Sequence, residues 1–402
     1  MIMFNLNSFL MSVSLALDLV EKEILGTKDF HSKRVAYMAL RLSQFLNLTP
    51  QESFDLVSLA IMHDNGLTEA LLKSDMSQEN FFQMETIHEH CIIGEKNTKN
   101  FPFLTAPTNV ILYHHEAYDG SGFFGKKGDE IPFMSQIIAF VDALDTQFYL
   151  MDDCLENKKR VCEYAKQHSG TYFNPKIVDA FLKLADTTAF WLDLDTFVLV
   201  DAIKEHLEEF EVKLSWEDIF VMSNVFSKII DSKSTFTAQH TSELIEKVET
   251  MAKFYQFDKE KILKLKIAAA LHDLGKLVVP NDILEKNGAL DDEEFNTIQS
   301  HTYFTHVTLK NVGVFSDIEK WAFQHHEKLD GSGYPYGLNG DELSFESRMM
   351  GCLDIYQAIT EIRPYRDSLS HEKAISIMDE MVLSNKIDKN ITNDINLVFG
   401  KR

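Results

Sequence analysis

The spacing of apolar residues along the chain is mostly that of amphipathic helices. Apolar side chains recur at positions i, i+3 and i+4, and the apolar and polar alternation of half-buried strands is scarce. The segment KILKLKIAAALHDLGK, residues 261–276, predicts an apolar helix that Gly275 ends, and HTSELIEKVETMAKF, residues 240–254, predicts the helix before it. Only 8 Pro and 17 Gly interrupt the 402 residues. The pattern therefore predicts an all-α fold.

Composition places the chain among globular proteins with a large core. Apolar residues make up 45% of it, and at about 150 residues per domain its length predicts two or three domains. The four cysteines form no CxxC pair, which predicts free thiols in a reducing compartment. Residues 1–20 lack the basic start of a signal peptide, and no stretch is long and apolar enough to span a bilayer. We therefore expect a cytoplasmic protein without membrane insertion.

The charge balance excludes polymeric polyanions as partners. The chain has 39 Lys and Arg against 62 Asp and Glu, which gives a formal net charge of −23. Neither DNA, RNA nor an anionic membrane surface is expected to bind such a chain nonspecifically. A small anionic ligand remains compatible with this charge if one site supplies local positive charge.

The histidine positions reveal an internal duplication, because ten of the 15 histidines fall into two series with similar gaps. The first series comprises His31, His63, Asp64, His90, His114, His115 and Asp142. The second series comprises His240, His272, Asp273, His301, His325, His326 and Asp354. The words HHEAYDGSG and HHEKLDGSG also match between the two halves. We expect two tandem helical bundle domains, 1–200 and 201–402, joined by a packed helical connection near residues 190–210.

The residue types in each series predict a metal site. Five histidines and two aspartates that converge inside a helical bundle form a mixed nitrogen and oxygen ligand set, which is larger than one ion needs. The set divides naturally between two divalent ions, with Asp273 as the candidate bridging ligand, and such a pair suits phosphoester cleavage. No series position is a cysteine, which argues against a structural zinc site and favours iron or manganese.

At these residues the second half of the chain resembles the HD-GYP family of HD metal-dependent phosphohydrolases, which cleave bacterial cyclic dinucleotides. The resemblance rests on HDLGK at residues 272–276 and HHEKLDGSGYP at residues 325–335. It implies that the seven residues of the second series are metal ligands and that Lys276 and the Gly333, Tyr334 and Pro335 motif belong to the active site. Some family members hold a third metal with a glutamate where this chain has Phe236. We therefore expect two ions.

The resemblance also implies a mechanism and a substrate class. Asp273 and Lys276 are the catalytic candidates, since a metal pair and a nearby cation stabilise the charge that develops on phosphorus. Arg363 and Arg366 are further candidates for binding the substrate phosphates. Cyclic di-GMP is the first candidate substrate, cleaved to the linear dinucleotide, with onward cleavage to GMP left open. A phosphodiesterase specific for 3′,3′-cyclic GMP-AMP is the alternative, and a non-catalytic adaptor that binds a cyclic dinucleotide is the second alternative.

The first half keeps the seven ligand types but changes the residues around them. Leu67 stands where Lys276 does, Phe123 and Phe124 replace Tyr334 and Pro335, and Gln136 replaces Arg348. These changes predict a degenerate copy of the catalytic domain. Its seven residues form a second candidate metal site, and the remaining roles open to it are regulation, ligand sensing or assembly of a homodimer.

Overall fold

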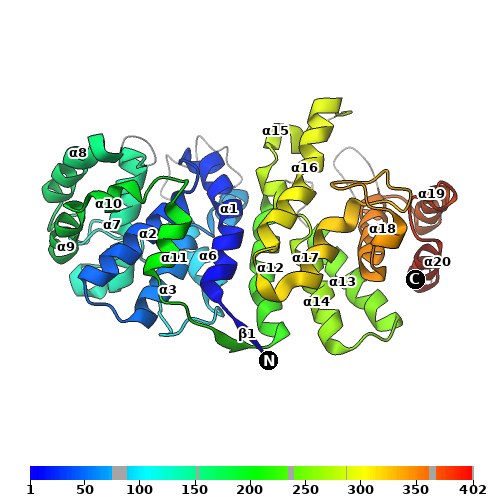
Figure 1. Cartoon of the computed structure of the whole chain (residues 1–402), viewed down its shortest axis with the longest axis horizontal. Helices are drawn as coiled ribbons and strands as arrows, with labels where there is room; N and C mark the ends of the chain where they lie inside the picture. Colours follow the sequence, from blue (N-terminus) through cyan, green and yellow to red (C-terminus); the bar gives the residue numbers. More distant parts are fainter. Residues whose placement is uncertain (75–87, 151–153, 234–239, 287, 362–367, 401–402) are drawn as a thin grey trace. The chain divides into compact units, whose positions relative to one another are not determined.

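The computed structural model describes residues 1–74, 88–150, 154–233, 240–286, 288–361 and 368–400 (Figure 1). It divides into two compact units, Met3–Lys213 and Leu214–Arg402, the latter together with Met1–Ile2. The stretch 190–210 contributes α10 and α11, which pack on helices α8, α9 and α2 of the N-terminal unit. The boundary between the units therefore falls after this stretch.

The described part of the N-terminal unit consists of helices apart from short strand segments at its start and end. The elements are β1 (Ile2–Phe4), α1 (Leu6–Leu25), α2 (His31–Phe45), α3 (Pro50–Ile61), α4 (Leu67–Ser74), α6 (Glu89–Thr98), η1 (Gly128–Glu130), α7 (Phe133–Phe148), α8 (Cys154–Gln167), α9 (Pro175–Ala185), α10 (Thr188–Leu192) and α11 (Leu199–His206). Strand β1 pairs with β2 (Val212–Leu214) in a two-stranded sheet.

The C-terminal unit is also built of helices. The elements are α12 (Trp216–Ser232), α13 (His240–Phe254), α14 (Lys259–Leu271), η2 (Leu274–Val278), α15 (Asn281–Leu284), α16 (Asp292–Leu309), η3 (Gly313–Phe315), α17 (Ser316–Phe323), η4 (Gln324–His326), η5 (Gly340–Glu342), α18 (Phe345–Thr360), α19 (His371–Leu383) and α20 (Lys389–Phe399). The all-α prediction is confirmed. No helix of the described residues combines the length and apolarity needed to cross a bilayer.

A central apolar helix forms the core of the C-terminal unit. Ile267 to Leu271 in α14 are all buried, and α14 packs against α12, α13 and α17 (Figure 1). The Asp258 carboxylate accepts a hydrogen bond from the Lys261 amide at 2.8 Å and caps the start of α14. Because α14 is buried, the residues at its carboxyl end lie inside the bundle.

Gly275 has a different role from the one predicted for it. Helix α14 ends at Leu271, and Gly275 lies in the following 3₁₀ turn. A Cβ atom at Gly275 would lie 1.9 Å from the carbonyl oxygen of His301. Gly66 in the N-terminal unit has the same close contact, at 2.3 Å from the carbonyl oxygen of His90. Both glycines therefore allow the turn to pack against the helix that carries the next histidine.

Candidate metal centres

Five helical elements bring the seven predicted ligands of the C-terminal unit together. His240 begins α13, His272 follows the last residue of α14, and His301 lies within α16. The adjacent His325 and His326 lie in η4, and Asp354 lies in α18. His272, His301 and His325 are fully buried. The ligand atoms of these three histidines therefore face the protein interior, whereas the His326 side chain is partly exposed.

The seven side chains form two clusters. In the first cluster, His240 Nε2 lies 3.2 Å from Asp354 Oδ1, and His272 Nε2 lies 3.1 Å from Asp273 Oδ2. The second cluster comprises His301, His325 and His326, with 3.5 Å between the Nε2 atoms of His301 and His325. Each cluster offers at least three donor atoms close enough together to hold one ion.

Asp273 lies between the two clusters. Its Oδ2 faces His272, and its Oδ1 lies 3.4 Å from His301 Nε2 and 3.9 Å from His325 Nε2. A carboxylate with one oxygen toward each of two ligand groups has the arrangement needed to bridge two metal ions. Asp273, the bridging ligand proposed from the sequence, therefore lies between the two ligand clusters.

Backbone carbonyls orient the histidine rings. The Nδ1 atoms of His272, His301 and His325 donate to the carbonyl oxygens three residues earlier, at 2.8, 2.6 and 2.6 Å. This leaves each Nε2 lone pair directed at the cluster, as in metal-ligating histidines. His272 Nε2 and Asp273 Oδ1 are buried and have no hydrogen-bond partner among the described residues. Such unsatisfied atoms fit a divalent ion, because burying them without a partner is costly.

The protonation states also suit metal ligation. Burial lowers the pKa of His301 to about 4 and the pKa of His325 to about 3, so both rings are neutral near pH 7. Burial opposes the charge on Asp273, but the charges of His272 and Lys276 hold its pKa well below its usual range. Neutral imidazole and ionised carboxylate are the forms that bind metals.

The Gly333 to Pro335 motif lies against the second cluster. The Tyr334 ring centroid is 4.9 Å from that of His326 and 6.3 Å from that of His301. A Cβ atom at Gly333 would lie 2.4 Å from Lys328 N, so this turn requires glycine to approach the backbone. The Glu327 carboxylate accepts hydrogen bonds from the amides of Tyr336 and Leu338 and fixes the loop, a role that the sequence did not indicate.

The cationic candidates differ in how the structure places them. Lys276 Nζ lies 2.6 Å from Asp273 Oδ2, beside the first cluster. Arg363 and Arg366 lie outside the described residues. Arg348, which the sequence comparison had counted among the positions altered in the first half, forms an ion pair with Asp388 at 2.8 Å.

A carboxylate that the sequence did not indicate supports His240. Glu361 Oε2 lies 3.1 Å from His240 Nδ1, immediately after α18. This contact orients the His240 ring, as backbone carbonyls orient the rings of His272, His301 and His325. In the N-terminal unit Asp145 takes this place, 2.7 Å from His31 Nδ1, and it also accepts a hydrogen bond from the buried Arg34. No motif contains either carboxylate.

The seven counterparts in the N-terminal unit form the same pair of clusters. His31 Nε2 lies 3.2 Å from Asp142 Oδ1, and His31, His63 and Asp142 form one candidate ligand group. Asp64 Oδ1 lies 3.2 Å from His90 Nε2 and 3.4 Å from His114 Nε2. His63 Nε2 and Asp64 Oδ1 are again buried without a hydrogen bond among the described residues.

The surroundings of the N-terminal clusters differ from those in the C-terminal unit. Leu67 is buried where Lys276 provides a cation, and Phe123 is half exposed where Tyr334 packs on histidine rings. Cys91 and His115 join His90 and His114 in the second ligand group. Burial opposes ionisation of Cys91, but the charges of His114 and His90 lower its pKa to about 6. Cys91 is therefore an additional donor that the histidine series did not include.

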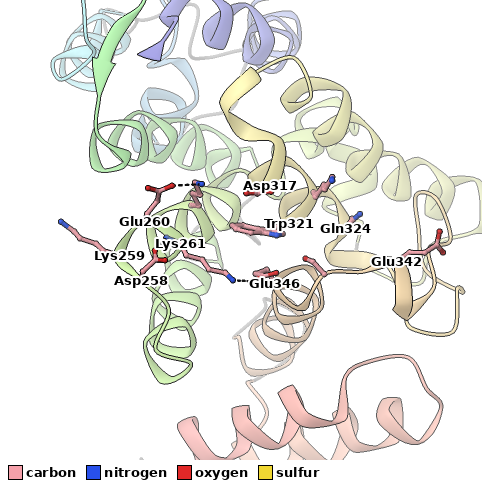
Figure 2. A pocket seen from close by; sticks show the side chains of 12 residues that line it. Asp258, Lys259, Glu260, Lys261, Asp317, Trp321, Gln324, Glu342 and Glu346 are labelled. Atoms are coloured by element: carbon pink, nitrogen blue, oxygen red, sulfur yellow. Dashed lines mark hydrogen bonds and ion pairs between the residues drawn. The ribbon is translucent and has the colours of Figure 1, made fainter. Parts of the chain in front are cut away.

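Each unit also contains a cavity or cleft. A cavity of about 340 Å³ opens beside His114, His115 and Asp142 and is lined by Tyr164 and Tyr172. In the C-terminal unit a cleft of about 910 Å³ lies around Trp321, away from the seven ligands (Figure 2). Its lysines include Lys261 and Lys264, which pair with Glu346 and Glu260. Four lysines and five acidic residues line the cleft in all, so it carries no net positive charge for a dianionic ligand.

Comparisons with known proteins agree with the site. The family model described as HD domain matches residues 19–152 and 224–391. The chain belongs to the HD domain family, and its resemblance to the HD-GYP phosphohydrolases is confirmed. It is therefore a hydrolase of a metal-dependent family.

Two relatives that match over most of the chain are Vibrio cholerae proteins. One, named 3′3′-cGAMP-specific phosphodiesterase 1, is 31% identical over 96% of this chain and 90% of its own length. The other, named 3′3′-cGAMP-specific phosphodiesterase 3, is 31% identical over 75% of this chain and 65% of its own length. A Vibrio cholerae protein named cyclic di-GMP phosphodiesterase is 33% identical over 42% of this chain and 37% of its own length.

A solved structure shares the fold. The crystal structure of a cyclic GMP-AMP specific phosphodiesterase from Vibrio cholerae matches with a TM-score of 0.69 at 24% identity. The match covers 100% of this chain and 99% of that chain. The fold of this chain therefore has a known counterpart.

Proposed function

We propose that the chain is a phosphodiesterase that hydrolyses 3′,3′-cyclic GMP-AMP to its linear form, with cyclic di-GMP a poorer substrate. The observation that carries the phosphodiester chemistry is Asp273, whose two oxygens face two separate ligand groups. The choice of dinucleotide reverses the order of the two candidates given by the sequence alone. It is supported by two relatives that match across both units and are named for cyclic GMP-AMP.

The C-terminal unit is the catalytic one in this proposal, and its seven ligands hold two divalent transition-metal ions, iron or manganese. When bound, the ions supply a nucleophile at neutral pH and neutralise charge on the phosphate. Burial holds the His301 and His325 rings neutral, and backbone carbonyls orient the rings of His272, His301 and His325. Burial keeps competing water out of the clusters, which strengthens the charge interactions within them.

Lys276 and Tyr334 bind and position the substrate. Lys276 is the cation nearest to the bridging carboxylate among the described residues, so its ammonium is placed to contact a phosphate oxygen. Tyr334 is held beside His326 by a loop that Glu327 fixes, and its ring forms a wall next to the second cluster. Arg363 and Arg366 stay candidates for the second phosphate. The N-terminal unit contributes regulation or assembly.

Product analysis tests this function directly. Purified full-length protein loaded with manganese or iron is offered 3′,3′-cyclic GMP-AMP and cyclic di-GMP separately, and the products are separated by chromatography. We expect the linear dinucleotide from cyclic GMP-AMP to form faster. Equal or faster cleavage of cyclic di-GMP would overturn the substrate assignment, and binding of both without turnover would identify the adaptor.

A further inference from the structure

The N-terminal unit has a thiol inside its second ligand group, and the C-terminal unit has none there. Cys91 follows His90 in α6 and is fully buried. Its Sγ lies 3.5 Å from His90 Nε2, and His90 Nε2 lies 3.4 Å from His114 Nε2. Three donors from two segments of the chain therefore lie within 4.8 Å of one another.

These distances match the edges of a tetrahedral zinc site. Zinc to nitrogen bonds of about 2.0 to 2.1 Å and a zinc to sulfur bond of about 2.3 Å imply nitrogen to nitrogen edges of roughly 3.3 Å and sulfur to nitrogen edges of roughly 3.5 Å. The separations of 3.4 Å and 3.5 Å agree with those edges. The side chains are thus already spaced for one ion.

Further donors complete the coordination. Asp64 Oδ1 lies 3.2 Å from His90 Nε2 and 3.4 Å from His114 Nε2, and this buried oxygen has no hydrogen bond among the described residues. His115 belongs to the same ligand group as Cys91. Four protein donors, from His90, Cys91, His114 and His115, therefore lie within 4.8 Å of one another, and four is the number that a closed structural zinc site uses.

The corresponding place in the C-terminal unit is different. Thr302 follows His301, and its hydroxyl donates a hydrogen bond to the carbonyl oxygen of Gln299 at 3.0 Å. The second cluster there comprises histidines alone, with Asp273 beside it. A cluster without the thiolate keeps room for a substrate oxygen, as catalytic sites do.

We propose that the N-terminal unit holds a resident zinc-type ion in a closed site with Cys91, His90 and His114 as ligands and Asp64 or His115 completing the tetrahedron. This inference rests on the proposed division of labour between the units and adds the metal class and the thiolate ligand. It differs from the expectation that a structural zinc site is disfavoured, which considered only the series positions. A closed site has no position for the substrate, so the ion stabilises the unit and does not turn over dinucleotide.

Cobalt substitution tests the thiolate ligand. Cobalt(II) is titrated into metal-free full-length protein, and the near-ultraviolet spectrum is recorded. We expect a thiolate-to-cobalt charge-transfer band that is lost in Cys91→Ser and retained in Cys162→Ser, a matched cysteine outside every ligand group. Absence of the band in the unsubstituted protein, or its persistence in Cys91→Ser, would overturn the proposal.

X-ray absorption gives a test that needs no substitution at Cys91. The full-length His272→Ala/Asp273→Ala variant is loaded with zinc, so that the C-terminal clusters contribute little to the signal. We expect a sulfur neighbour at about 2.3 Å from zinc. A zinc shell of nitrogen and oxygen alone would contradict the proposal. Hydrolysis by the unsubstituted protein is measured separately. A zinc shell without sulfur would therefore leave the proposed function standing, and an absence of hydrolysis would leave the zinc site standing.

Discussion

The two units present the same seven histidines and aspartates, yet they place different chemistry around them. In the C-terminal unit Lys276 lies 2.6 Å from the central carboxylate and Tyr334 packs on His326. In the N-terminal unit a buried leucine and a half-exposed phenylalanine occupy those places, and Cys91 enters the ligand group. The residues around the metal ligands therefore indicate which unit catalyses turnover better than the ligands do, since both units have the same ligand types.

Removal of metal has the largest expected effect and separates the two kinds of centre. Brief treatment with a chelator followed by desalting should reduce hydrolysis to background, because the open C-terminal clusters release their ions first. Added manganese or iron should restore the rate. Metal analysis of the chelated protein should still find about one zinc-type ion, held by the closed site. Full loss of metal with full retention of hydrolysis would break the comparison.

Replacement of Lys276 by leucine gives the C-terminal unit the residue that the N-terminal unit has at this position, Leu67. Charge-assisted contacts are worth about 1.5 to 3 kcal/mol, so Lys276→Leu should lower kcat/KM by roughly tenfold to a hundredfold. Lys276→Arg, which keeps the charge, should retain more of the rate. An unchanged rate in Lys276→Leu would show that this difference between the units does not matter for turnover.

The close glycine contacts are a feature that the units share. Gly275→Ala and Gly66→Ala would each force a Cβ atom against a carbonyl oxygen, so each should lower stability by about 1 to 3 kcal/mol in thermal or urea unfolding. Gly313→Ala is the control, because no atom lies within 4 Å of its Cβ position. Equal stability of all three variants would contradict the packing described for the turn.

Exchange of the loop aromatics should have the smallest effects. Tyr334→Phe removes one hydroxyl beside the second cluster and should lower kcat/KM by at most about tenfold. Phe123→Tyr, the reverse change in the N-terminal unit, should leave turnover unchanged. A larger loss in Phe123→Tyr than in Tyr334→Phe would place the substrate in the N-terminal unit.

The sequence predicted the helical fold and the convergence of the ligands because both are recorded in spacing. Apolar periodicity marked α13 and α14, and two registered histidine series marked the clusters. Glu361 and Asp145 were missed, because contacts between elements distant in the chain leave no local pattern. Cys91 was not among the candidate metal ligands, because only positions shared by the two histidine series were considered.

Other features depend on packing that spacing does not record. Gly275 was interpreted as a helix stop, although the carbonyl of His301 is what requires a glycine there. Arg348 was noted only as a position that differs between the two halves, and its ion pair with Asp388 was not foreseen. A single arginine or glycine letter does not identify its partner, since the partner comes from another helix.

The central claim is that turnover belongs to the C-terminal unit, and one pair of variants tests it most directly. Initial rates of 3′,3′-cyclic GMP-AMP hydrolysis are measured for His272→Ala and His63→Ala in the full-length chain, with folding checked by circular dichroism. We expect His272→Ala to abolish hydrolysis, because it removes a ligand beside the bridging carboxylate. His63→Ala should keep substantial activity. Loss of hydrolysis in folded His63→Ala with retention in His272→Ala would show that the roles of the two units are reversed.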